Sequence, residues 1–174
     1  MNTIHSPLFV AVTLLAMQIA LAQKPPEPLL HTIVVNASVT QVWKAFTTRD
    51  GIESWMAASA SVELRVGGLM RTSYVKLDDL DSGAAIHNRI LSFDPERMIS
   101  LQCVRTPEKF PFKAAIAKAW TNIYFESVGE NKTRVTSRML GFDNTPESVQ
   151  CRNFFVQGNQ IELDALTKHF GKSK

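Results

Sequence analysis

One long helix is predicted at the carboxyl end of this 174-residue chain, and it limits how the rest can fold. Thr145 is a good helix-capping residue, Pro146 suits the first helical position, and Gly171 suits a helix stop. Lys168 and His169 fall in the last turn, where positive charge is favourable. These signals predict a helix of about 24 residues, roughly 36 Å long.

The middle of the chain alternates apolar and polar residues, a period that indicates β-strands. Residues 31–35 form the first predicted strand, and residues 36–56 have the caps and spacing of two short helices. Further strands follow in three hairpins, which reverse at residues 67–68, 94–97 and 129–131. One face of an antiparallel sheet must be covered, and only the carboxyl-terminal helix is long enough to cover it. The sequence therefore predicts an α+β fold.

The amino-terminal segment, residues 1–22, contains no Lys, Arg, Asp or Glu and ends in a small-x-small pattern at residues 20–22. This composition predicts a signal peptide cleaved before Gln23, and so a secreted or periplasmic protein. A retained membrane anchor is the alternative, because no Lys or Arg precedes the apolar run; contact with a membrane is expected only in that case. Residues 23–30 form a Pro-rich leader, and residues 31–174 form one folded domain.

Cys103 and Cys151 are the only two cysteines. In an exported protein two cysteines can pair, so a disulfide between them is one interpretation. Two separate buried thiols are the other, because such thiols behave as small apolar side chains. Pairing requires Cα atoms within about 7 Å of each other, which a sequence does not specify.

Motifs for metal binding, phosphate binding and nucleophilic catalysis are missing from the sequence. The four histidines lack metal-binding spacing, and no nucleophile elbow or phosphate loop occurs. The net charge is +3 without a cluster of Lys or Arg, which argues against a nucleic-acid partner. The sequence therefore assigns no catalytic residue, no metal and no cofactor. Whether the protein is an enzyme stays open, as does its oligomeric state.

Arginines indicate how the predicted strands are oriented. An unpaired Arg is rarely buried, so the Arg positions are placed on the outer face of the sheet. The alternate residues then face the long helix. His87 shares the phase of Arg89 and is predicted at the surface. Most facing residues are apolar, and ordinary core packing accounts for them. The polar ones either bond to each other and to water or line a cavity that accepts a polar ligand group; they are Tyr74, Asn88, Thr121 and Ser137.

The candidate ligand-binding residues come from this inner face and from two helical positions. Trp43 and Phe46 have the spacing of a buried helix face and are assigned to the core, whereas Trp55 belongs to the core or to a pocket rim. Gly158 interrupts the long helix at a cost of about 1 kcal/mol relative to Ala, which a close approach to the sheet or room for a ligand would explain. The candidate set is Trp55, Met70, Thr72, Tyr74, Asn88, Thr121, Ile123, Phe125, Ser137, Met139 and Gly158.

Four segments follow one another ahead of the long helix: SVTQVWKAFTTRDGIESWM, ELRVGGLMR, RILSFDPERMISLQ and TNIYFESVGENKTRVTSRMLGF. Their order and spacing resemble the SRPBCC superfamily of START-like, helix-grip proteins, and within it the branch named for the heat-shock-chaperone ATPase activator. The resemblance spans nearly all of residues 31–170. It implies a curved antiparallel sheet of about seven strands wrapped around the long helix, with a cavity between them and two short helices after the first strand.

Members of this superfamily bind apolar or amphipathic small molecules, act as cyclases, including polyketide cyclase-like enzymes, or serve as protein-binding modules. The branch has no shared catalytic residues. Its name does not imply an activity here, because a cytosolic chaperone is not available to an exported protein.

Three functional hypotheses follow. The first is an exported protein that binds a small apolar or amphipathic molecule in the cavity. The second is a cyclase- or hydrolase-like enzyme that uses Tyr74, Asn88 or a cavity water for proton transfer; a large cavity with a perturbed titratable group would favour it. The third is a protein-interaction module that uses the outer face of the sheet or the loop at residues 106–118.

Overall fold

A computed structural model describes residues 26–171 of the chain. The predicted signal peptide lies outside the described residues, as does the start of the Pro-rich leader. The elements in chain order are β1 (Leu29–Val35), α1 (Val39–Thr47), α2 (Arg49–Glu53), β2 (Ser59–Val62), β3 (Leu69–Ser73), β4 (Ile86–Asp94), β5 (Met98–Arg105), α3 (Lys113–Lys118), β6 (Trp120–Gly129), β7 (Lys132–Leu140) and α4 (Pro146–Gly171).

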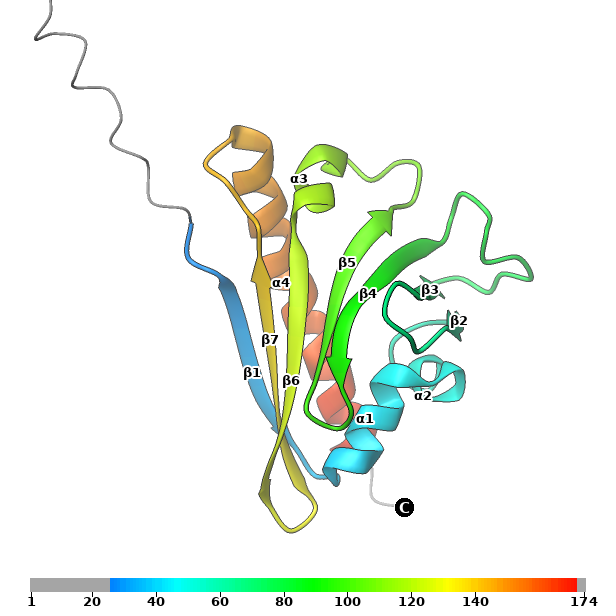
Figure 1. The fold of residues 1–174 in the computed structure, drawn as a ribbon, viewed down its shortest axis with the longest axis vertical. Helices are drawn as coiled ribbons and strands as arrows, with labels where there is room; N and C mark the ends of the chain where they lie inside the picture. The colour runs from blue at the N-terminus through cyan, green and yellow to red at the C-terminus, as the bar shows by residue number, and fades with distance from the viewer. Residues whose placement is uncertain (1–25, 172–174) are drawn as a thin grey trace, which may run out of the picture.

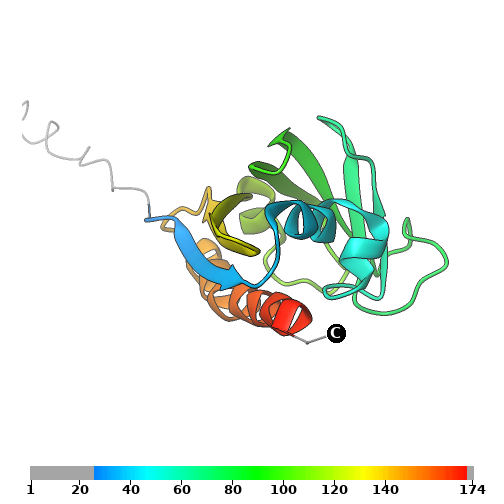
Figure 2. The same ribbon diagram turned by 90° about the horizontal axis from the view of Figure 1, so that it is seen from below.

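The strands form one seven-stranded antiparallel sheet in the order β1-β7-β6-β5-β4-β3-β2. Each strand from β2 to β7 pairs with its neighbour in the sequence, and β1 joins the far edge beside β7. The sheet is curved, and α4 runs across its concave side next to β1 (Figures 1 and 2). This confirms the predicted α+β helix-grip fold with two short helices after the first strand.

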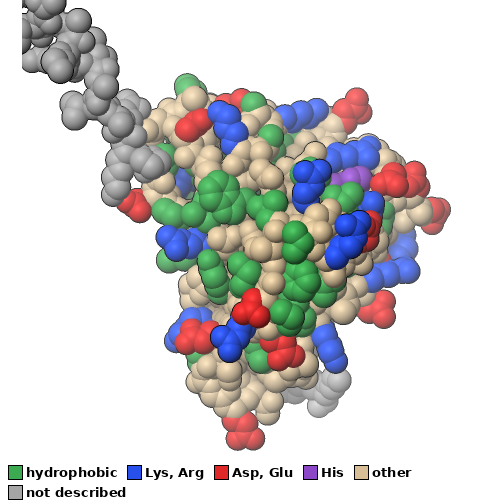
Figure 3. All heavy atoms as spheres, viewed as in Figure 1, with side chains coloured by type: hydrophobic (Ala, Val, Ile, Leu, Met, Phe, Trp, Pro, Cys, Tyr) green, Lys and Arg blue, Asp and Glu red, His purple; other side chains and the backbone are tan. Residues whose placement is uncertain are grey.

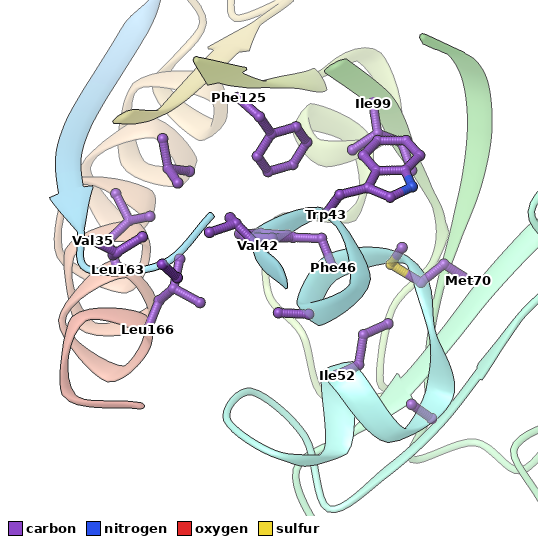
Figure 4. Close-up of a cluster of buried hydrophobic side chains, with 14 of the residues drawn as sticks. Val35, Val42, Trp43, Phe46, Ile52, Met70, Ile99, Phe125, Leu163 and Leu166 are labelled. Atoms are coloured by element: carbon purple, nitrogen blue, oxygen red, sulfur yellow. The ribbon is translucent and has the colours of Figure 1, made fainter. Parts of the chain in front are cut away.

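The main core lies where α1 enters the concave side of the sheet (Figure 4). The side chains of Val42, Trp43 and Phe46 form the buried face of α1, as their spacing predicts. Phe125 of β6 packs edge-on against Trp43, with ring centroids 5.7 Å apart, and against Phe46 at 5.2 Å. Because these rings fill the closed end of the curved sheet, Trp43 has a structural role.

A second apolar cluster joins the start of α4 to α3 and to the other end of the sheet. It includes Ile116, Met139 and Cys151. The carboxylate of Glu147 accepts hydrogen bonds from the backbone amides of Ala114 and Ala115 at 3.0 and 3.2 Å, so the first turn of α4 caps α3. Residues 106–118, predicted as an irregular loop, therefore contain a short anchored helix.

Two sequence predictions need correction at the level of individual residues. The first strand begins at Leu29, two residues before its predicted start, because Leu29 pairs with Met139 and is buried. His87 is only 6% exposed, although it was predicted at the surface. It lies on the outer face, as its phase with Arg89 predicts, but its Nε2 atom contacts the Leu80 carbonyl oxygen at 2.7 Å. The segment between β3 and β4 folds back over this part of the outer face.

Candidate functional site

A pocket of about 200 Å³ lies on the concave side of the sheet, between the strands and α4. Its walls come from both apolar clusters: Phe46 and Met70 belong to the first, and Ile116 and Met139 to the second. The sheet and the helix thus pack tightly at their two ends and leave a space between. A mostly apolar cleft with a few polar groups is typical of small-molecule sites.

Most of the candidate residues predicted from strand phase line this pocket. The alternation of inward and outward side chains brings them together from four strands, β3, β4, β6 and β7, and from the segment after β3. They are Met70, Thr72, Tyr74, Asn88, Thr121, Ile123, Ser137 and Met139.

Three candidates do not line the pocket. Phe125 is buried in the core between Trp43 and Phe46. Trp55 packs on Phe46, with ring centroids 5.0 Å apart, and its indole Nε1 donates a hydrogen bond to the Ala45 carbonyl at 3.0 Å. Of its two interpretations, the structure therefore supports the core. Trp55 supports the pocket indirectly, because Phe46 forms part of the pocket wall.

Gly158 is the third exception. A Cβ atom at this position would meet nothing within 4 Å, so a close approach to the sheet does not explain the glycine. Gly158 also does not line the pocket, so room for a ligand does not explain it either. The explanation offered from the sequence is wrong. Nothing in the structure explains why glycine is present at this point of α4.

The helix contributes a pocket wall that the sequence reasoning missed. Phe155, Asn159 and Glu162 of α4 all line the pocket. They are spaced by four and three residues, so they lie on one face of the helix. This spacing is a usable signal, but exposed apolar residues elsewhere on α4, such as Phe154 and Ile161, obscure it. The segment before α3 adds Thr106, Pro107 and Phe110, and the segment between α2 and β2 adds Met56 and Ala57.

One hydrogen bond spans the pocket from the sheet side to the helix. The Tyr74 hydroxyl donates to the Glu162 Oε1 atom at 2.7 Å. Tyr74 follows β3 and is 65% exposed, so its ring forms the rim of the pocket while its hydroxyl reaches α4. Burial raises the pKa of the Glu162 carboxyl above its ordinary value, and the hydrogen bond from Tyr74 opposes this change. Burial, and then the Glu162 carboxylate, raise the pKa of Tyr74.

Other polar side chains line the pocket without joining each other. Among the described residues, no hydrogen bond links the side chains of Asn88, Thr121 and Ser137 to one another. The Nδ2 atom of Asn159 is buried and has no hydrogen-bond partner. Unpaired buried polar groups cost about 1–3 kcal/mol each, so partners from a ligand or from water would be stabilising here.

The two cysteines are free in this structure. Cys103 is half-buried in the pocket wall, and Cys151 is fully buried in the second cluster, against which Cys103 packs. Burial raises the pKa of the Cys103 thiol, and burial together with Glu147 raises the pKa of Cys151 to about 11. Both thiols are thus unreactive near neutral pH, as buried apolar groups would be.

The described part of the chain shows no other recognisable centre. Within residues 26–171, no three His, Cys, Asp or Glu side chains lie close enough together to hold a metal ion. No helix in the same range combines the length and the apolar character needed to cross a membrane.

The model of the family described as "Activator of Hsp90 ATPase homolog 1-like protein" matches residues 36–171. The chain belongs to this family. Membership confirms the branch of the helix-grip superfamily that the four sequence segments resemble. A search of curated proteins found no match to this sequence.

Solved structures with the same fold include proteins from several bacteria. The Aha1 dimer from Colwellia psychrerythraea is 19% identical, over 82% of this chain and 95% of that one, with a TM-score of 0.61. CalU16 from Micromonospora echinospora is 18% identical, over 82% of this chain and 75% of that one, with a TM-score of 0.59. DynU16, a putative protein in the dynemicin biosynthetic locus, is 16% identical, over 86% of this chain and 49% of that one, with a TM-score of 0.60. At these identities the comparisons show a shared fold alone.

Proposed function

We propose that this protein binds a small apolar molecule with at least one polar group in the pocket between the sheet and α4. The observation that carries this proposal is the lining itself. Apolar side chains such as Met70 and Ile123 form most of the wall, while Asn88, Thr121 and Ser137 place polar groups within it. A dry, purely structural core would not place unlinked polar side chains around an open space.

The size of the pocket bounds the ligand. A cavity of about 150 Å³ is enough to hold benzene in an otherwise apolar protein core. The pocket here, at about 200 Å³, suits a molecule somewhat larger than benzene, such as an eight-carbon chain or a substituted single ring. It is smaller than the sites that hold drug-sized ligands, which measure about 300–1,000 Å³.

Calorimetric titration with octanol tests this proposal, because octanol is apolar, carries one hydroxyl and has no charge. Ser137 lines the pocket, and Ser137→Leu would fill part of it. Ser127 on the neighbouring strand is exposed and lies outside the pocket, so Ser127→Leu is the matched control.

We expect octanol to bind the native protein and the Ser127→Leu control equally, and Ser137→Leu at least about tenfold more weakly. Native mass spectrometry of the same samples adds the mass of any ligand that copurifies. A native protein that neither carries an adduct nor binds octanol would contradict the proposal.

An enzymatic role in the same pocket is the second candidate, and the Tyr74–Glu162 pair favours it. A carboxyl whose pKa is raised by burial is a typical acid–base group, and here it lies in a cleft. One relative in fold, DynU16, comes from a biosynthetic locus, which fits small-molecule chemistry. A hydrolase-like activity predicts turnover of p-nitrophenyl butyrate that Glu162→Gln abolishes while octanol binding persists. If the native protein does not hydrolyse this ester, the hydrolase-like hypothesis is contradicted.

A protein-interaction role has weaker support. The face of the sheet that turns away from α4 shows apolar side chains scattered among charged ones rather than one continuous patch (Figure 3). The residues of the 106–118 segment that pack inward, such as Phe110 and Ile116, line the pocket. Large exposed apolar patches are the usual sign of such a role, so we favour the ligand-binding proposal.

We also propose that the protein is exported and that residues 1–22 are removed. The support is the uncharged, apolar amino-terminal sequence with its small-x-small end. Expression of the full chain in a bacterial host, followed by amino-terminal sequencing of the product, tests this. A product that begins at Gln23 in the periplasm or medium is expected, and an unprocessed chain in the membrane fraction would contradict the proposal.

A further inference from the structure

Among residues 26–171, one charged side chain lines the pocket, and it is negative. Of the described residues that line the pocket, Glu162 alone carries a formal charge; the rest are apolar or neutral polar side chains. This contrasts with the chain as a whole, which carries a net charge of +3. A single carboxylate in an apolar cleft dominates the local electrostatic potential, because no other described residue of the lining carries a charge to oppose it.

Within the described residues, Glu162 has no positively charged partner. No ion pair among residues 26–171 joins it to Lys, Arg or His. Its neighbours at three and four positions along α4 are Gly158, Asn159, Ala165 and Leu166, and none of them carries a charge. Its hydrogen-bond partner in the structure is the neutral Tyr74 hydroxyl.

The Glu162 side chain is half-buried at the pocket, and the Tyr74 hydroxyl compensates only in part for the water that it loses. One Oε1 hydrogen bond to Tyr74 satisfies only part of its capacity, since an ionised carboxylate accepts about four hydrogen bonds. A ligand with an ammonium group would supply the missing donors and the opposite charge. A ligand carboxylate would instead face a like charge in a poorly solvated space.

From this geometry we propose that the pocket selects amphipathic amines, in which the ammonium group pairs with Glu162 and the apolar body occupies the cleft between α4 and the sheet. This inference rests on the proposed ligand-binding function and deepens it by naming the ligand class. Asn159 lies one turn before Glu162, and its Nδ2 atom has no hydrogen-bond partner in the protein. This amide can donate to a second polar group on the ligand.

The ionisation of Glu162 should then control binding. Burial raises the pKa of Glu162, and a bound ammonium group would lower it again. The other titratable groups of the pocket lining are Tyr74 and Cys103, and the pKa of each is raised, so both stay neutral near pH 7. Amine affinity should therefore weaken as the pH falls through the pKa of Glu162, while octanol affinity should not.

The test compares three probes of equal length, octylamine, octanol and octanoate, by calorimetry at neutral pH. The protein is the full chain produced in an exporting host. Glu162→Gln removes the charge and keeps an oxygen that can accept from Tyr74. Asp164→Asn on the exposed face of the same helix is the matched control. Circular dichroism and octanol binding report whether each variant is folded.

We expect octylamine to bind the native protein about ten- to a hundredfold more tightly than octanoate, the range for a hydrogen bond to a charged group. Glu162→Gln should abolish this preference, and Asp164→Asn should retain it. Equal affinity of the native protein for amine and carboxylate would overturn the inference and leave the proposed function standing. An amine preference that survives Glu162→Gln would also overturn it. Failure of all three probes to bind would overturn both.

Discussion

The same substitution, glycine to alanine, should change the stability of this protein in opposite directions at two helical positions. Gly158 lies in the interior of α4, and a Cβ atom there would meet nothing within 4 Å. Gly51 lies in α2, where a Cβ atom would collide with the Lys44 carbonyl oxygen and lie 2.8 Å from the Cα atom of Ala45. Gly51 thus allows α2 to approach α1, whereas Gly158 allows nothing comparable.

The expected sizes follow from these surroundings. Glycine in a helix interior is about 0.5–1 kcal/mol less favourable than alanine, so Gly158→Ala should stabilise the fold by about that amount. In a domain of this size, a gain of 1 kcal/mol raises the midpoint of thermal unfolding by about 2–4 °C. Gly51→Ala forces backbone atoms apart, and such overpacking costs about 1–3 kcal/mol.

Differential scanning calorimetry of the native protein and both variants measures these effects, with urea unfolding as an independent check. The midpoint should rise for Gly158→Ala and fall for Gly51→Ala. Octanol affinity should be unchanged in Gly158→Ala, because Gly158 does not line the pocket. A fall in the midpoint or in octanol affinity for Gly158→Ala would refute the reasoning and return this glycine to the functional site.

Three further predictions concern the core, the pocket carboxyl and the thiols. Phe125→Ala removes a buried ring that contacts Trp43 and should cost about 3–5 kcal/mol of unfolding free energy, measured by urea titration; a cost under 1 kcal/mol would contradict the packing. The pKa of Glu162 is raised in the folded state above its ordinary 4.5, so its ionisation favours the unfolded chain as the pH rises above 4.5. Glu162→Gln should therefore leave stability unchanged near about pH 4 and increase it near about pH 8, and equal effects at both pH values would contradict this. Cys151 should resist alkylation by iodoacetamide at about pH 8 until the protein unfolds, because its pKa is raised to about 11 and it is fully buried; rapid labelling of the folded protein would be inconsistent with the structure.

The alternation of apolar and polar residues predicts most of the fold, because along the strands this pattern agrees with how the side chains pack. The caps at Thr145 and Pro146 and the reversal at residues 129–131 indicate the elements that the structure contains. The phase of the strands also identifies most of the sheet side of the pocket, since alternate side chains must face α4.

Features that depend on packing between distant segments are the ones that the sequence conceals. His87 has the right phase, but its burial depends on the segment between β3 and β4 folding over it. Glu162 looks like any surface helix residue until α4 is placed over the pocket. Gly158 is the opposite case: its place in the helix suggests a functional role, but no atom lies close enough to require a glycine.

Binding of a small molecule in the space between the sheet and α4 can be tested directly with the methionines. Met56, Met70 and Met139 line the pocket, whereas Met98 in β5 does not. Methyl-labelled methionine gives each a separate NMR signal that can be followed during titration with octylamine or octanol. We expect the signals of Met56, Met70 and Met139 to shift saturably and the signal of Met98 to stay unchanged. Shifts that include Met98 equally, or no saturable shift at all, would contradict binding at this site.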